Sequence, residues 1–114
     1  MILIVDDEPD ICDVLAIFLK REGYETEVVK LGRDAIAKFE ENKPSHVFLD
    51  IKLPDIDGIE VLKKLKETSC ETPVIMMTAF RDAERAVSAF RLGARDCIFK
   101  PFDFNYIKAS MRCP

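Results

Sequence analysis

The sequence predicts an α/β fold in which helices cover both faces of a parallel β-sheet. Short apolar runs rich in β-branched residues recur along the chain, at 2–5, 26–29, 46–49, 74–77 and 97–99. The segments between these runs carry apolar residues at helical spacing. A strand–helix unit that repeats in this way implies parallel strands, because each helix returns the chain to the same end of the sheet.

Each predicted strand is followed by one apolar stripe of a helix. The stripes are Ile11, Val14, Leu15, Phe18 and Leu19; Ala35, Ile36 and Phe39; Ile59, Leu62 and Leu65; Ala86, Val87 and Phe90; and Phe104, Ile107 and Met111. Pro9 suits the first turn of a helix, and Gly23 and Gly93 lie where helices should end. Pro44 and Pro73 precede the third and fourth strands.

Composition narrows the class of protein. The chain has 114 residues, of which 48% are hydrophobic, so one domain with a real core is expected. The net charge of −4 provides no basic footprint for nucleic acid, and no apolar run is long enough to span a membrane. The four cysteines form no C-x-x-C pair and His46 is the sole histidine, which argues against zinc. We therefore expect a cytoplasmic protein with reduced thiols.

Polar residues follow four of the predicted strands. Right-handed crossovers place the carboxyl ends of all parallel strands at one edge, which is where ligands bind in such folds. Asp6 and Asp7 follow the first strand, Asp50 the third, Thr78 the fourth and Lys100 the fifth. Each residue alone would be an ordinary helix cap or surface group. Their expected meeting at one edge indicates a functional site.

This set of residues suits phosphoryl transfer. Asp6, Asp7 and Asp50 would repel one another, and a hard cation with oxygen ligands such as Mg²⁺ would relieve that repulsion. A carboxylate can serve as the nucleophile and form an aspartyl phosphate. Thr78 can donate a hydrogen bond to an anionic oxygen, and Lys100 can pair with it as a point charge.

From "LIVDDE" near the start to "KPFD" near the end, the sequence resembles the receiver domain of two-component response regulators. The resemblance rests on "DIKLPDIDG" at 50–58, "MTAF" at 77–80 and "FKPF" at 99–102. It implies a flavodoxin-like, CheY-like (βα)5 fold with strand order 2-1-3-4-5. It also implies that Asp50 accepts a phosphoryl group from a sensor histidine kinase.

The resemblance further implies a Mg²⁺ site and a switch. Asp7, Asp50 and the backbone carbonyl of Lys52 would bind the metal directly, and Asp6 would bind it through water. In the family, the threonine moves towards the phosphoryl group, and an aromatic residue three places before the lysine turns inward behind it. That aromatic position is Cys97 here.

The lysine and the threonine of the site have implied roles of their own. Thr78 and Lys100 would bind the phosphoryl oxygens, and the peptide bond before Pro101 would be cis. A thiol is too small to act as a swinging ring. We therefore expect Cys97 to be a small core filler, and the signal to leave through Thr78 and the loop before the fourth helix.

Two surfaces follow from the resemblance. The output surface would be the fourth helix, fifth strand and fifth helix, which also offer a face for a homodimer. Its residues would include Arg81, Glu84, Arg85, Arg91, Arg95 and Tyr106. The kinase would dock along the first helix near Asp10, Ile11 and Val14, with apolar contact from Leu53 and Pro54. No direct contact with nucleic acid or membrane is expected.

The stretch "AVSAFRLGARDCIFKPFD" resembles receivers of nitrogen-regulator-type transcriptional activators. We expect residues 1–114 to form a single receiver domain at the N-terminal part of a longer regulator, whose effector controls transcription. The domain would catalyse only its own phosphotransfer and slow autodephosphorylation, and would not be an enzyme acting on other substrates.

Other functions are compatible with parts of the pattern. A haloacid-dehalogenase-type phosphohydrolase also uses an aspartate nucleophile and Mg²⁺, but it needs a second Asp where this chain has Lys52. A flavin module would have a phosphate loop rich in Ser, Thr and Gly in place of "DDEPD". No G-x-x-x-x-G-K-[ST] motif is present, which excludes a P-loop nucleotidase. A receiver that works alone, without a DNA-binding partner domain, remains an alternative.

Overall fold

The computed structural model describes residues 1–79, 82, 84–100 and 102–112. The elements are β1 (Ile2–Val5), α1 (Pro9–Arg21), β2 (Thr26–Val29), α2 (Gly32–Asn42), β3 (His46–Asp50), α3 (Gly58–Thr68), β4 (Val74–Ala79), α4 (Glu84–Arg91), β5 (Asp96–Lys100) and α5 (Phe104–Arg112). The strands pair in parallel in the order β2-β1-β3-β4-β5. The predicted fold and strand order are confirmed.

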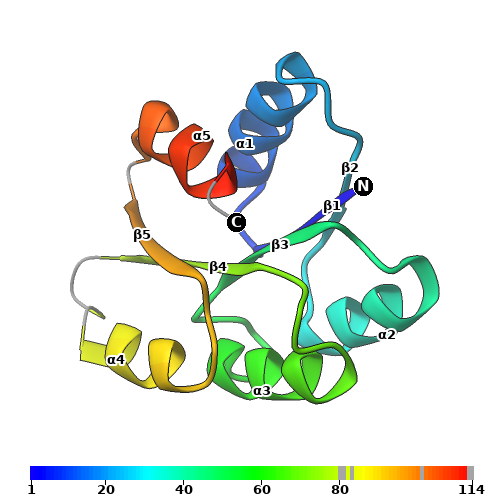
Figure 1. Cartoon of the computed structure of the whole chain (residues 1–114), viewed down its shortest axis with the longest axis vertical. Helices are drawn as coiled ribbons and strands as arrows, with labels where there is room; N and C mark the ends of the chain where they lie inside the picture. The colour runs from blue at the N-terminus through cyan, green and yellow to red at the C-terminus, as the bar shows by residue number, and fades with distance from the viewer. Residues whose placement is uncertain (80–81, 83, 101, 113–114) are drawn as a thin grey trace.

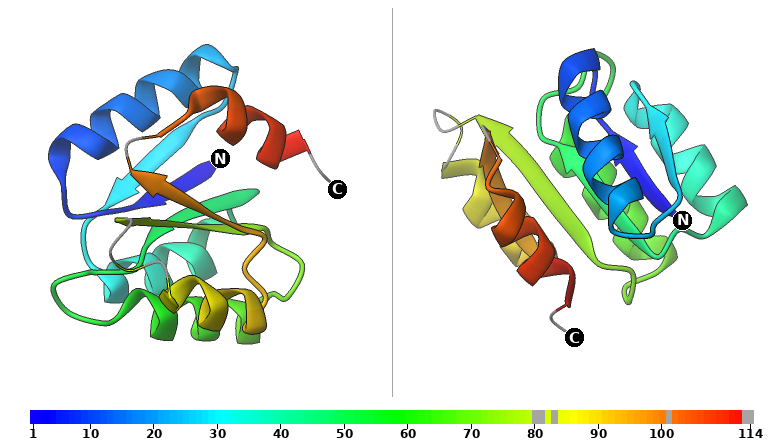
Figure 2. Two further views of the ribbon diagram at one scale, coloured as in Figure 1. Left: turned by 90° about the vertical axis from the view of Figure 1, so that its left-hand side faces the viewer. Right: turned by 90° about the horizontal axis from the view of Figure 1, so that it is seen from above.

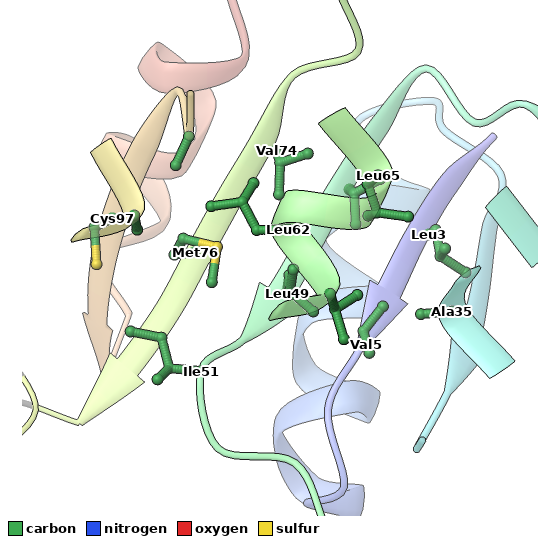
Figure 3. Packing of buried hydrophobic residues seen from close by; sticks show 14 of the residues in the cluster. Leu3, Val5, Ala35, Leu49, Ile51, Leu62, Leu65, Val74, Met76 and Cys97 are labelled. Carbon is green, nitrogen blue, oxygen red and sulfur yellow. The ribbon is translucent and has the colours of Figure 1, made fainter. Parts of the chain in front are cut away.

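The sheet lies between two layers of helices. Helices α1 and α5 cover one face, and α2, α3 and α4 cover the other (Figures 1 and 2). Alternate residues of each strand point to opposite faces of the sheet, so an apolar core lies on each face. Leu3 and Val5 pack with α2–α4 in one core, whereas Ile2 and Ile4 pack with α1 and α5 in the other. Figure 3 shows the first of these cores. Burial on both faces explains why the inner strands read as continuous apolar runs.

Three strands extend further than predicted. β3 includes Asp50, β4 includes Thr78 and Ala79, and β5 ends at Lys100, which pairs with Ala79. The reason is that backbone ladders continue irrespective of side-chain polarity, whereas the sequence pattern ends where the apolar residues end. The polar residues therefore occupy the last rungs of the sheet, where the backbone holds them firmly.

Two predicted helix stripes are partly wrong. On α1 the buried residues are Cys12, Leu15 and Leu19, and Val14 is 48% exposed. On α4 the helix buries Ala86 and Ala89. Val87 and Phe90, which were predicted to face the core, are 53% and 49% exposed. A periodicity identifies an apolar face, but the helix rotates to bury the set that fits closest against the sheet.

Glycines set the ends of helices and one tight approach. Gly23 and Gly93 follow α1 and α4 with φ of +94° and +99°, as predicted for helix ends. Gly58 is required for a different reason, because a Cβ there would lie 2.1 Å from the carbonyl oxygen of Asp50. Its amide donates a 2.7 Å hydrogen bond to the carbonyl of Ile51. Gly58 thus draws the start of α3 against the end of β3.

In the part of the chain that the structure describes, no helix is both long and apolar enough to cross a bilayer. The expectations for Arg81 on the output surface and for the peptide bond before Pro101 fall outside the described residues.

We predict that Gly58→Ala costs about 2 to 3 kcal/mol of unfolding free energy, because the added methyl must displace backbone atoms. Gly23→Ala is the matched control. It meets no atom within 4 Å, so only its positive φ opposes the change, at a cost of about 1 kcal/mol. Urea unfolding followed by circular dichroism measures both. An equal loss in the two variants would contradict the close approach at Gly58.

Candidate functional site

A depression of about 230 Å³ lies at the carboxyl edge of the sheet. It is lined by Asp7, Glu8, Asp50, Lys52, Ala79, Asp82 and Lys100. These residues come from the ends of β3, β4 and β5 and from the segments that follow β1, β3 and β4. In an open parallel sheet this edge is where ligands bind.

The three predicted aspartates lie together at this depression. One carboxylate oxygen from each of Asp6, Asp7 and Asp50 lies within 4.8 Å of the others. Asp6 is fully buried, Asp50 is 6% exposed and Asp7 is open to solvent. The end of β1 places the first two, and the last rung of β3 places the third. The set therefore has a buried base and an accessible rim.

Lys100 is the cation of the site. Its Nζ lies 2.9 Å from Oδ2 of Asp6, 3.0 Å from Oε1 of Glu8 and 3.5 Å from Oδ2 of Asp50. Burial disfavours the charged ammonium, but these carboxylates outweigh burial and raise the pKa of Lys100. The side chain therefore stays positively charged across the physiological range. Its placement confirms that the ends of β1, β3 and β5 converge.

Asp50 is held in an unfavourable electrostatic environment. Burial, and next the negative charge of Asp6, raise the pKa of Asp50 to about 7, against the lowering effect of Lys100. The backbone amide of Lys52 donates a 3.3 Å hydrogen bond to its Oδ1. One ammonium thus compensates only part of the local negative charge. A further cation would favour the ionised form of Asp50.

The donor set fits a hard divalent cation. Carboxylate oxygens are the ligands that Mg²⁺ prefers, and it commonly takes one or two of them together with water. Oδ1 of Asp6 accepts a 2.9 Å hydrogen bond from the amide of Glu8. Its buried Oδ2 lies 2.9 Å from the ammonium of Lys100. A carboxylate oxygen has a second lone pair, so Asp6 can also accept a hydrogen bond from a water bound to a cation.

Thr78 lies next to the depression but is not among the described residues that line it. It is 1% exposed, and its hydroxyl donates a 3.1 Å hydrogen bond to the carbonyl of Ala79. The hydroxyl must turn away from that carbonyl before it can reach a group bound beside Asp50. The sequence placed Thr78 at the correct edge but not its side-chain direction.

Cys97 lies in the core between β5 and α4. It is 9% exposed and belongs to the same apolar cluster as Ala89 and Met76. Figure 3 labels Cys97 and Met76 within this cluster. Burial, and next the charge of Asp96, raise the pKa of its thiol to about 11. The thiol is therefore protonated and inert near neutral pH. Its burial agrees with the expected filler, and its part in switching stays a prediction.

Two acidic residues of the depression were not predicted as site residues. Glu8 was visible only as the third acid after the first strand, yet it pairs directly with Lys100. Asp82 lies 3.3 Å from the ammonium of Lys52. No sequence signal indicated Asp82, because its partner is on another loop far away in the chain.

We predict that Asp50→Asn stabilises the metal-free protein by on the order of 3 kcal/mol at pH 8. The folded-state pKa of about 7 lies above the ordinary value of 3.8, so ionised Asp50 penalises folding above pH 7. That penalty disappears as the pH falls towards about 4, and the advantage of Asn should shrink with it. Urea unfolding at pH 8, 6 and 4.5 measures this, and a gain that is constant with pH would contradict it.

The same experiment with Mg²⁺ has a defined expectation. Millimolar Mg²⁺ should raise the unfolding midpoint of the parent at pH 8, because binding to the folded state adds stability. The midpoint of Asp50→Asn should rise much less. Equal shifts in both proteins would place the metal elsewhere.

Comparison with known proteins agrees with this geometry. Residues 2–112 match the response regulator receiver domain family. The regulatory protein AtoC of Escherichia coli is 42% identical over 91% of this chain, and the transcriptional regulatory protein TrcR of Mycobacterium tuberculosis is 38% identical over 97%. The chain spans 23% of the length of AtoC and 43% of that of TrcR.

Solved structures show the same similarity in space. The receiver domain of NtrX from Brucella abortus superposes with a TM-score of 0.92 at 38% identity, with all of both chains covered. A CheY-like receiver domain from Methanospirillum hungatei gives 0.91 at 33% identity, over 97% of this chain and 89% of that one. Relatives such as AtoC and NtrX support the resemblance to nitrogen-regulator-type activators. From its sequence, its fold and the residues gathered at one edge of its sheet, we conclude that this chain belongs to the response regulator receiver domain family.

Proposed function

We propose that this domain is a phosphoacceptor switch in which Asp50 receives a phosphoryl group from a phosphohistidine of a sensor histidine kinase. The observation that carries the proposal is the position of Asp50. Its carboxylate is almost buried in an acid-lined depression, 3.5 Å from the ammonium of Lys100. A nucleophile beside a fixed cation is what phosphoryl transfer requires, since the reaction depends on positioning and charge neutralisation.

The acids of the depression would hold Mg²⁺. We assign Asp7, Asp50 and the backbone carbonyl of Lys52 as direct ligands, and Asp6 as a ligand through water. Support comes from the proximity of the three carboxylates and from the burial of Asp6 and Asp50 beside a single ammonium. When bound, Mg²⁺ neutralises the carboxylates and the charge that develops on the transferred group.

The transfer itself needs no acid–base residue from this chain. An oxygen of ionised Asp50 forms a bond to phosphorus while the bond from phosphorus to the imidazole nitrogen breaks, and the electron pair stays on that nitrogen. Lys100 then pairs with a phosphoryl oxygen. Thr78 binds another after its hydroxyl leaves the carbonyl of Ala79. These movements convert a local change of charge into a change at the end of β4.

The output surface would be α4, β5 and α5. Large apolar side chains are exposed there, namely Val87, Phe90, Phe99 and Tyr106. A depression of about 300 Å³, lined by residues of β5 and by Tyr106 of α5, offers a hollow into which a partner side chain could fit. Exposed apolar side chains on neighbouring elements favour a protein partner, and we propose a second copy of the domain. Glu84 and Arg91 lie at exposed positions of α4, where they suit a reversible contact.

The kinase would dock on α1. Asp10 and Val14 are exposed there, and Ile11 is half-buried. Ile17 adds a further exposed apolar side chain, at 57%. Pro54 is also exposed, whereas Leu53 is partly buried against the core and offers less contact than predicted.

We propose that the domain forms the N-terminal part of a longer transcriptional regulator, as the similarity to AtoC supports. The net charge of −4 supports control of transcription through an effector, without direct contact between this domain and nucleic acid. A cytoplasmic location follows from that role. The domain would have no turnover on outside substrates, because position 52, where a phosphohydrolase needs an acid, is a lysine paired with Asp82.

Phosphorylation by acetyl phosphate tests the proposal directly. In the presence of Mg²⁺, the intact mass of the parent should rise by one acid-labile phosphoryl group, and Asp50→Asn should show no such adduct. Lys100→Met is expected to label much more slowly. No Mg²⁺-dependent adduct on the parent, or the same adduct on Asp50→Asn, would refute the mechanism.

Replacement of Cys97 tests the proposed signal route. Cys97→Ala should cost about 1 kcal/mol of stability and leave both Asp50 labelling and the phosphorylation-dependent change in assembly intact. Mass spectrometry and sedimentation measure the two. If labelling persists while the change in assembly is lost, Cys97 is part of the switch and the filler role is wrong.

A further inference from the structure

The acidic residue Asp55 contacts a helix that it does not belong to. Asp55 lies in the loop between β3 and α3, five positions after Asp50. Its Oδ1 accepts a 2.7 Å hydrogen bond from the amide of Gly32. Its Oδ2 accepts 3.0 Å and 3.3 Å bonds from the amide and Nε of Arg33. The carboxylate thus spans the gap from the acceptor loop to the first turn of α2.

Helix α2 lacks a cap from its own sequence. Its N-cap position is Leu31, whose side chain makes no capping bond. The first amides of a helix have no partner within the helix, so a side chain from elsewhere must satisfy them if they are buried. Asp55 does this, and its negative charge also suits the positive end of the helix dipole. Burial works against ionisation, but the amides of Arg33 and Gly32 hold the pKa of Asp55 at about 2.

The junction is tightly packed. A Cβ added at Gly32 would lie 2.8 Å from Cγ2 of Val61, 3.2 Å from Cβ of Ile56 and 3.4 Å from Oδ1 of Asp55. The glycine therefore lets the helix end approach the loop closely. A contact this close fixes the position of the loop in a way that an exposed surface pair would not.

The same loop is held at its two ends by other bonds. At its start, the amide of Lys52 bonds to Oδ1 of Asp50, and Gly58 bonds back to Ile51. At its end, Asp57 accepts a 2.8 Å bond from the amide of Ile59 and pairs with Arg85 of α4. The bonds of Asp55 to α2 fix the middle of the loop.

We propose that Asp55 is a positioning residue for the phosphoacceptor site, which acts by capping α2 and so holding the backbone of Lys52 against Asp50. This role rests on the proposed function, in which the backbone carbonyl of Lys52 is a ligand of Mg²⁺. Asp55 does not touch the reacting groups. It reduces the conformations available to the loop before metal and phosphoryl donor arrive.

Asp55→Ala tests the proposal in the metal-free protein and with Mg²⁺ alone. Hydrogen exchange should become faster at the amides of Lys52 and Gly58, as well as at Gly32 and Arg33. Calorimetric titration should give a Mg²⁺ dissociation constant about 5-fold higher. The corresponding loss of binding free energy is similar to the stability that a helix loses with its N-cap. Faster exchange confined to Gly32 and Arg33, with unchanged Mg²⁺ affinity, would overturn the proposal.

A matched control separates positioning from general destabilisation. Lys66→Met removes the bonds from Nζ to the carbonyls of Thr72 and Cys70, beyond the opposite end of α3. It should lower stability without altering Mg²⁺ affinity or exchange at Lys52. A rise in the Mg²⁺ dissociation constant equal to that of Asp55→Ala would count against a special role of Asp55.

The conservative variant Asp55→Asn adds a graded test that survives poor folding of Asp55→Ala. Asn has one acceptor oxygen where Asp has two, so it cannot replace both the Oδ1 bond from Gly32 and the Oδ2 bonds from Arg33. The Mg²⁺ affinity should therefore lie between the values for the parent and Asp55→Ala. An Asn variant with parental affinity and exchange would overturn the proposal. Labelling of the parent by acetyl phosphate runs alongside. If the parent accepts no phosphoryl group but Asp55→Ala still weakens the binding of Mg²⁺, the proposed function fails and the positioning role stands.

Discussion

The repulsion between buried carboxylates at the ends of β1 and β3 is the constraint on which the rest of this structure depends. Asp6 is fully buried and Asp50 nearly so, and together they raise the cost of ionising the site. Lys100, delivered by β5, offsets part of that cost from 2.9 Å and 3.5 Å. Breaking such a buried pair leaves an unpaired charge, which is far more costly than losing a surface pair. Some repulsion between the carboxylates therefore remains uncompensated, and binding of a metal or a phosphoryl group would change it.

The sheet makes this arrangement sustainable. Apolar cores on both faces fix the strands, so residues on the last rungs cannot drift apart in response to their repulsion. Gly58 and Asp55 then bind the loop after β3 to α3 and α2. The apolar cores, Gly58 and Asp55 thus hold the charged groups in place, although none of these contacts lies in the depression itself. The helix on the output face, α4, buries only alanines against the sheet, so its contact with the core is shallow.

Particular residues show how far sequence reasoning reached. The strand order, the helix-ending glycines at 23 and 93, and the convergence of Asp6, Asp7, Asp50 and Lys100 were all predictable. Each follows from periodicity, from backbone preference or from the family resemblance. The exposure of Val14, Val87 and Phe90 was not predictable, because a helix with apolar residues on several sides can bury either set. The roles of Asp55 and Asp82 were also hidden, since Asp55 bonds to the first turn of α2 and Asp82 pairs with Lys52 on the loop after β3.

By itself the sequence determined the layout of this protein: alternating strands and helices, one polar edge, and the residue types of a phosphoacceptor site. Those features follow from local patterns, which repeat wherever the same apolar spacing and turn residues occur. The tertiary structure alone decided that Asp6 and Asp50 are buried while Asp7 is exposed, and that Asp55 caps α2. These depend on distances between segments far apart in the chain, which packing sets and no local pattern encodes.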